Sequence, residues 1–284
     1  MTGFIERRFS AQDGLPLYAR EYGDSLANGV PVLCLTGLTR NCKDFHSLAV
    51  HLSAKRRVLC PDYRGRGQSA YDRDWRNYQP RVYLDDIRHL LAICQVDRFV
   101  AIGTSMGGLL ACGLACVIPC SVAGVVINDS GPDLNPDGLG RIFSYIAKDR
   151  PQPDLESAAR ELRLLFPNLP ISDDAGWQQM AEFTFRQRED GLWHFDWDVN
   201  LAKPLLEPEG PMPALWAIYR ALGRIPSIAI RGELSDVLTE ATFDRMGWEK
   251  SDLVRVTIPG VGHTPSLGEP AARAVIDALL AGLD

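Results

Sequence analysis

Phe99-Val-Ala-Ile-Gly-Thr-Ser-Met-Gly-Gly-Leu-Leu110 is the stretch that decides the fold of this chain. Its first four residues form a short apolar run that predicts a buried strand, and the small residues over 109–117 predict a helix. Between them lies G-x-S-x-G, which is typical of a sharp strand-to-helix turn that exposes a nucleophilic serine. We therefore expect the hydroxyl of Ser105 to stand above a sheet. The flanking glycines fit this turn, because a Cβ at either position would crowd the adjoining strand or helix.

Length, composition and charge restrict the class of protein. The chain has 284 residues, of which 46% are hydrophobic, so it can bury one large core that carries an insertion. Its net charge of −6 argues against nucleic acid or an anionic membrane as the partner. The first ten residues lack the apolar segment of a signal peptide, and no apolar run approaches the roughly 20 residues that span a bilayer. We expect a cytoplasmic monomer or homodimer that acts on a small molecule.

The cysteines give no sign of a disulfide framework or a metal centre. There are seven of them, an odd number, and no two are spaced as C-x-x-C. Small packing residues that stay reduced are the simplest interpretation. We therefore expect no metal site.

Apolar and alternating runs along the chain predict strands, and amphipathic runs between them predict helices. The predicted strands cover residues 4–10, 15–22, 31–35, 57–60, 99–102, 122–128, 227–231 and 254–258. Asp13-Gly14 between the first two indicates a hairpin. The alternation of the later strands with helices favours a mostly parallel sheet with helices on both faces. The hairpin would then be the antiparallel edge of an α/β fold.

The alternation stops after residue 129, and several short helices separated by prolines are predicted up to about 222. We interpret 135–222 as a helical cap inserted between two core segments, 1–134 and 223–284. Such a cap would lie over the carboxyl edge of the sheet, where ligands bind in open α/β sheets. Most of its aromatic residues are expected to form its own core. A minority, for which we select Trp197, would line an apolar substrate pocket.

A serine nucleophile needs a base within hydrogen-bond reach. Of the five histidines, His263 lies in a glycine-rich loop just past the last predicted strand. That loop would emerge at the same edge of the sheet as the turn around Ser105, so we predict that His263 is the general base. His194, which lies among aromatic residues of the predicted cap, would at most touch a substrate.

The base in turn needs a carboxylate that orients its ring. Asp236 follows the strand before the histidine loop, and the order Ser105, Asp236, His263 is the one that this motif favours. Asp129, which follows the strand after the serine turn, is the second choice. Glu233 is a further alternative, although it would more naturally brace its own turn.

An oxyanion needs two backbone N–H donors near the serine. Met106 supplies one of them at the start of the helix after Ser105, and Leu38 would supply the other from the loop after strand 31–35. Gly37 would permit the close approach of backbone and substrate. We therefore include Gly37 among the candidate substrate contacts.

These motifs together resemble the α/β-hydrolase superfamily, in particular its capped esterases, enol-lactonases and carbon–carbon hydrolases. The segments that carry the resemblance are Asp13-Gly14-Leu15, Thr36-Gly37, 62–69, 103–108, 232–236 and Gly262-His263. The resemblance implies an eight-stranded sheet, a helical lid and no cofactor. One departure is Thr36-Gly37, where family members usually have His-Gly, which raises the question of how this loop is supported. The run 62–69 is expected to be architectural.

Three functions remain open on these residues. The first is a serine hydrolase that cleaves a small or medium carboxylic ester through an acyl-enzyme. The second uses the same residues to cleave a carbon–carbon bond or open an enol-lactone, with Arg40 or Asn41 binding a carboxylate or keto group of the substrate. The third is a ligand sensor without catalytic activity on the same fold.

Overall fold

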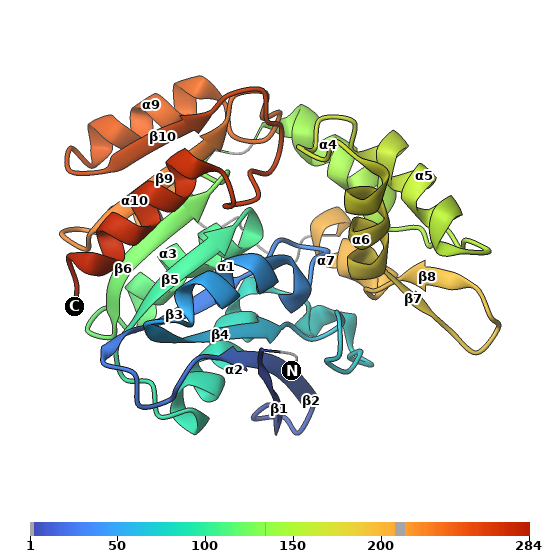
Figure 1. The fold of residues 1–284 in the computed structure, drawn as a ribbon, viewed down its shortest axis with the longest axis horizontal. Helices are drawn as coiled ribbons and strands as arrows, with labels where there is room; N and C mark the ends of the chain where they lie inside the picture. The colour runs from blue at the N-terminus through green and yellow to red at the C-terminus, as the bar shows by residue number, and fades with distance from the viewer. Residues whose placement is uncertain (1–2, 134, 208–213) are drawn as a thin grey trace.

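An eight-stranded sheet forms the centre of the computed structural model, which describes residues 3–133, 135–207 and 214–284 (Figure 1). Its strand order is β1-β2-β4-β3-β5-β6-β9-β10. The bounds are β1 (Ile5–Ser10), β2 (Pro16–Tyr22), β3 (Gly29–Leu35), β4 (Arg56–Asp62), β5 (Phe99–Thr104), β6 (Val122–Asn128), β9 (Ser227–Gly232) and β10 (Val254–Ile258). The β1–β2 hairpin pairs antiparallel with β4, and the other neighbours are parallel. The expected mostly parallel sheet with an antiparallel edge is confirmed.

Helices cover both faces of this sheet because its central strands are apolar on both sides. In β5, Val100 and Ile102 pack with α1 (His46–Leu52) and α10 (Pro270–Ala281). Ala101 on the same strand belongs to the cluster on the opposite face. The helices of that face are α2 (Pro80–Ile93), α3 (Met106–Val117) and α9 (Glu240–Glu249). Because both faces of these strands are buried, the strands read as continuous apolar runs, and such short runs could be recognised as strands in the sequence.

The chain between β6 and β9 leaves the sheet and forms a separate group of elements (Figure 1). They are α4 (Pro136–Ile146), α5 (Leu155–Leu165), α6 (Asp174–Thr184), β7 (Phe185–Gln187), β8 (Trp193–Phe195), η3 (Val199–Ala202), α7 (Lys203–Leu206) and α8 (Leu215–Arg220). The expectation of helices alone was incomplete, because β7 and β8 form an antiparallel hairpin. The boundary at 134 falls outside the described residues, and α8, near the boundary at 222, packs against core helix α3.

Hydrogen bonds join the inserted segment to the core at residues next to the β7–β8 hairpin. The side chain of Asn41, next to the short helix η1 (Cys42–Phe45), donates to the carbonyl oxygen of Phe183 at 2.8 Å. Tyr78, which follows η2 (Trp75–Asn77), donates through its hydroxyl to Asp198 Oδ2 at 2.7 Å. These contacts tie the segment to the loops that follow β3 and β4. No helix within the described ranges is both long and apolar enough to cross a membrane.

Candidate active site

Ser105 occupies a strained turn between β5 and α3. Its φ and ψ are 53° and −120°, a conformation that costs a non-glycine residue about 1–3 kcal/mol. A Cβ on Gly103 would come within 2.1 Å of the carbonyl oxygen of Gly107, and one on Gly107 within 2.0 Å of that of Leu35. The predicted need for both glycines is therefore confirmed. The turn lifts the serine side chain off the sheet and into a cavity.

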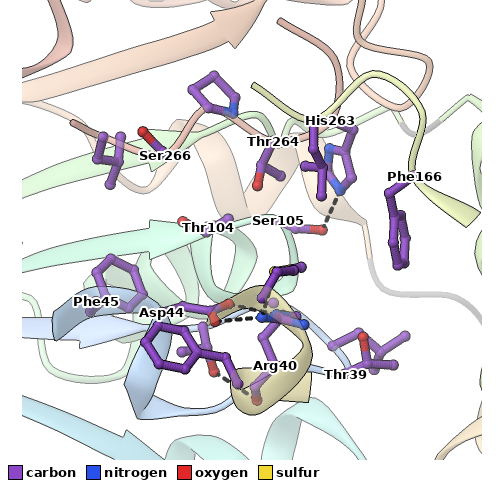
Figure 2. A pocket seen from close by; sticks show the side chains of 18 of the residues that line it. Thr39, Arg40, Asp44, Phe45, Thr104, Ser105, Phe166, His263, Thr264 and Ser266 are labelled. Atoms are coloured by element: carbon purple, nitrogen blue, oxygen red, sulfur yellow. Dashed lines mark hydrogen bonds and ion pairs between the residues drawn. The ribbon is translucent and has the colours of Figure 1, made fainter. Parts of the chain in front are cut away.

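His263 reaches Ser105 from the loop after β10, as expected from the sequence. Its Nε2 lies 3.1 Å from Ser105 Oγ, and Figure 2 shows the two side chains pointing toward each other. Its Nδ1 lies 2.6 Å from Asp129 Oδ2. Serine, imidazole and carboxylate thus form one hydrogen-bonded chain, although 158 positions separate Ser105 from His263. In this arrangement the imidazole can accept the serine proton while the carboxylate stabilises the resulting charge.

Asp129 is held in place by three hydrogen bonds and is completely buried. It directly follows β6 and has a φ of 51°, which turns its side chain toward the histidine loop. Besides His263, its carboxylate accepts the N–H of Gly232 at 2.9 Å and the hydroxyl of Ser235 at 2.6 Å. A buried carboxylate with this number of donors has little freedom to rotate. It is therefore a rigid partner for the imidazole.

Asp236, the first choice from the sequence for this carboxylate, does not hydrogen-bond His263. It forms an ion pair with Arg141 of α4, with nitrogen–oxygen distances of 2.6 and 2.8 Å. This hydrogen-bonded guanidinium lowers the pKa of the Asp236 carboxyl. The expectation that Asp236 hydrogen-bonds the imidazole was therefore wrong, and the second choice, Asp129, is the carboxylate that contacts His263 Nδ1. The third, Glu233, accepts the N–H of Gly260 at 2.7 Å, so its side chain ties the loop after β9 to the loop after β10 and does not brace its own turn.

The two expected oxyanion donors lie in the loop after β3 and at the first turn of α3. Within the described ranges, neither the N–H of Leu38 nor that of Met106 has a hydrogen-bond partner. Leu38 is held through its carbonyl oxygen, which accepts a hydrogen bond from Nε of the fully buried Arg66. The hydroxyl of Tyr63 donates to the carbonyl oxygen of Thr36 at 3.4 Å. Residues of the run 62–69 therefore provide the support that was in question for this loop.

A cavity of about 270 Å³ opens above Ser105, between the carboxyl edge of the sheet and the inserted segment (Figure 2). Gly37 and Arg40 line it, as expected, but Trp197 and Asn41 do not. The indole of Trp197 is instead buried, stacked on Phe195 with ring centroids 4.0 Å apart. The apolar residues that line the cavity include Ile142, Phe166, Leu169, Ile171, Met180 and Phe183. Over the described part of the chain, no group of three or more acidic, histidine or cysteine side chains is arranged to hold a metal ion.

Gly37 offers a graded test of the oxyanion loop. A Cβ there would lie 3.5 Å from Arg40 Cγ and 3.7 Å from Ser105 Cβ, which is ordinary contact. Gly37→Ala should therefore leave hydrolysis nearly unchanged. The two extra methyl groups of Gly37→Val would enter the space where the oxyanion forms, and kcat should fall about 10²–10³-fold, the usual cost of one lost donor. Steady-state kinetics of both variants would check this, and equal effects of alanine and valine would contradict it.

Comparison with known proteins adds independent information. Residues 32–278 match the model of the alpha/beta hydrolase family. A 3-hydroxybutyrate-oligomer hydrolase from Cupriavidus necator is 32% identical over 92% of this chain and 92% of its own length. A 2-(acetamidomethylene)succinate hydrolase from Mesorhizobium japonicum is 26% identical over 97% of this chain and 96% of its own length. The crystal structure of an alpha/beta hydrolase from Novosphingobium aromaticivorans superposes with a TM-score of 0.92 at 39% identity, covering 99% of each chain.

Proposed function

Since the chain belongs to the alpha/beta hydrolase family, we propose that it hydrolyses carboxylic esters through an acyl-enzyme on Ser105. The hydrogen-bonded chain of Ser105, His263 and Asp129 beneath the cavity carries this proposal. An isolated serine hydroxyl is a weak nucleophile at neutral pH, and a base in contact with it is what activates it.

The proposed reaction proceeds in two halves. Ser105 Oγ attacks the ester carbonyl while His263 Nε2 takes its proton, and the N–H groups of Leu38 and Met106 bind the oxyanion. The proton then passes from His263 to the leaving alcohol. Water enters, His263 activates it in the same way, and the acyl group is released as a carboxylic acid. Asp129 keeps Nδ1 of the imidazole protonated and stabilises the imidazolium in both halves.

Two observations favour an ester over the alternatives. The relative from Cupriavidus necator is named for a substrate whose units are joined by esters. Carbon–carbon or enol-lactone cleavage was considered with Arg40 or Asn41 binding a carboxylate or keto group, but Asn41 is buried outside the cavity and Arg40 is already paired with Asp44. A sensor without activity would have no use for a base in contact with the serine.

A fluorophosphonate probe tests the proposal directly. We expect the probe to label Ser105 and abolish hydrolysis of p-nitrophenyl butyrate in the same proportion, because it reacts with an activated serine. Peptide mapping by mass spectrometry would identify the labelled residue. A vinylogous diketone serves as the comparison substrate. Turnover of the diketone without ester hydrolysis would favour carbon–carbon cleavage, and an unlabelled Ser105 would favour the sensor.

A further inference from the structure

Arg66 is a completely buried cation whose contacts are all with uncharged groups. Its Nε donates to the carbonyl oxygen of Leu38, one terminal nitrogen donates to the carbonyl oxygen of Arg64 at 2.8 Å, and the other donates to the hydroxyl of Tyr83 at 3.2 Å. No carboxylate among the described residues forms an ion pair with this guanidinium. The positive charge of Arg66 is therefore not compensated by an acidic side chain.

A paired guanidinium occurs two residues earlier in the same loop. Arg64 is almost as deeply buried, and it forms ion pairs of 2.7 Å with Asp13, Asp72 and Asp86. Arg66 has only the faces of two tyrosine rings, whose centroids are 5.4 and 4.8 Å from its Cζ. An unpaired charge is costly to bury, and cation–π contacts offset only part of that cost. Such departures from good folding practice are expected at functional sites.

Arg66 binds the residue that supplies one of the proposed oxyanion donors. Its Nε binds the carbonyl oxygen of Leu38, and the N–H of Leu38 is the donor. The N and O atoms of one residue are at most about 4 Å apart along their bonds, and each hydrogen bond adds about 3 Å. The guanidinium therefore lies within about 10 Å of the oxyanion. At an effective dielectric constant of about 20, a unit charge at that distance favours an anion on the order of tenfold.

The charge lies on the side of Ser105 where the negative charge develops. Figure 2 shows His263 on one side of Ser105, and Thr39 and Arg40 of the loop after β3 on the other. Because Arg66 binds this loop, its charge is nearer to the oxyanion than to the imidazolium that forms on His263. The ester that binds first is uncharged. The guanidinium therefore favours the transition state over the bound substrate.

The backbone around Arg66 is fixed by the inserted segment. The N–H of Gly67 donates to the carbonyl oxygen of Asp196 at 3.1 Å, and the N–H of Asp198 donates to that of Gly65 at 2.8 Å. The guanidinium is thus held in place on both sides before a substrate enters. A charge that needs no reorganisation during the reaction is the most effective at lowering its barrier.

We propose that Arg66 is a positioning residue that stabilises the oxyanion in two ways. It fixes the N–H of Leu38 through the neighbouring carbonyl group, and its unpaired charge favours the negative charge that this N–H binds. The role rests on the proposed ester hydrolysis through Ser105.

Three substitutions of Arg66 separate the hydrogen bond from the charge. In Arg66→Gln, Nε2 is bonded to Cδ as Nε of arginine is, so the amide can still donate to Leu38 although the charge is gone. We expect kcat for p-nitrophenyl butyrate to fall about tenfold and KM to stay within about twofold. Arg66→Lys keeps the charge and a donor, so kcat should stay within about threefold. Arg66→Met keeps neither, and kcat should fall about 10²–10³-fold, as when an oxyanion donor is lost.

Two ketone inhibitors give a readout that a purely structural role would not change. The hydroxyl oxygen of Ser105 adds to the carbonyl carbon of butyl trifluoromethyl ketone, the hydroxyl proton passes to His263, and the carbonyl oxygen becomes an oxyanion. Butyl methyl ketone fills the cavity without this addition and stays uncharged. Arg66→Gln should raise the inhibition constant of the trifluoromethyl ketone about tenfold and leave that of the methyl ketone within about twofold.

Arg57→Gln is the matched control. Arg57 is also buried, but it lies near the start of β4, whereas Arg66 lies beyond the end of this strand. Its guanidinium forms an ion pair with Glu21 at 2.6 Å. Because the control breaks a buried pair, it should lower the unfolding temperature and leave kcat and both inhibition constants unchanged. Arg66→Gln should show the reverse, a lower kcat with an unfolding temperature close to that of wild type.

Four results would overturn the role of Arg66 and leave the esterase intact. They are wild-type kcat in Arg66→Gln, equal weakening of both ketones, failure of Arg66→Gln to fold, which would show that the charge serves the fold, and a loss in Arg66→Lys as large as that in Arg66→Met. A wild-type enzyme that hydrolyses no ester and is not inhibited by the trifluoromethyl ketone would refute the proposed function as well.

Discussion

Replacing Ser105 by alanine is expected to lower kcat for p-nitrophenyl butyrate about 10⁶-fold, which is the effect of losing the nucleophile of a serine–histidine–aspartate triad. The acyl-enzyme cannot form without Oγ, and the remaining residues give only the activity of the cavity and the oxyanion donors. Stopped-flow measurement should also lose any burst of nitrophenol, because the burst reports acylation of the serine.

Ser130→Ala is the matched control for this variant. Ser130 lies at the same edge of the sheet, directly after Asp129, and is more deeply buried than Ser105; its hydroxyl has no hydrogen-bond partner within the described residues. Its removal should leave kcat within about twofold, since no interaction in the site is lost. Thermal unfolding of both variants would show whether the fold is kept. Residual activity of a folded Ser105→Ala protein above about one thousandth of wild type would move the chemistry to another residue.

Most of the fold could be predicted because its elements have strong local patterns. Buried parallel strands such as β5 and β6 are continuous apolar runs, and an Asp-Gly turn marks the β1–β2 hairpin. The β7–β8 hairpin was missed because each strand is only three residues long. No period can be recognised in three residues, so these strands depend on contacts with the rest of the fold.

Some residues around Ser105 could also be predicted from local sequence patterns, and others could not. Ser105 and His263 could be located because each is tied to the end of a strand and to a recognisable loop. Whether Trp197 lines the cavity could not be predicted, because the sequence shows the size of its side chain but not its neighbours. In the structure its ring stacks on Phe195 and its N–H donates to the carbonyl oxygen of Ile146. The contribution of Arg66 to the oxyanion loop is a contact over 28 positions, which no local pattern reveals.

The carboxylate was misassigned for a reason that concerns the sheet itself. β6 and β9 are neighbouring parallel strands, so the acids that follow them, Asp129 and Asp236, emerge at the same edge. Sequence order alone cannot separate them. The backbone turn at Asp129 and the capture of Asp236 by Arg141 decide between them, and both depend on tertiary structure.

Asp129→Asn is accordingly expected to lower kcat about 10⁴-fold, whereas Asp236→Asn should leave it within about threefold. An amide at 129 cannot hold the imidazole in the tautomer that accepts the serine proton, or stabilise the imidazolium. Asparagine at 236 loses only a pair whose side chains are 32% and 42% exposed, which is worth up to about 1 kcal/mol of stability. Steady-state kinetics and thermal unfolding of both variants would check this.

Arg141→Met is the control that gives the comparison its meaning. If Asp236 acts only by binding α4, Arg141→Met should reproduce the small effect of Asp236→Asn, and the double variant should be no worse than either single one, because both changes break the same contact. A loss near 10⁴-fold in Asp236→Asn alone would instead make Asp236 the acid, with its ion pair to Arg141 opening during turnover. A large loss in both aspartate variants would mean that His263 needs two carboxylates, and the assignment to Asp129 would then be incomplete.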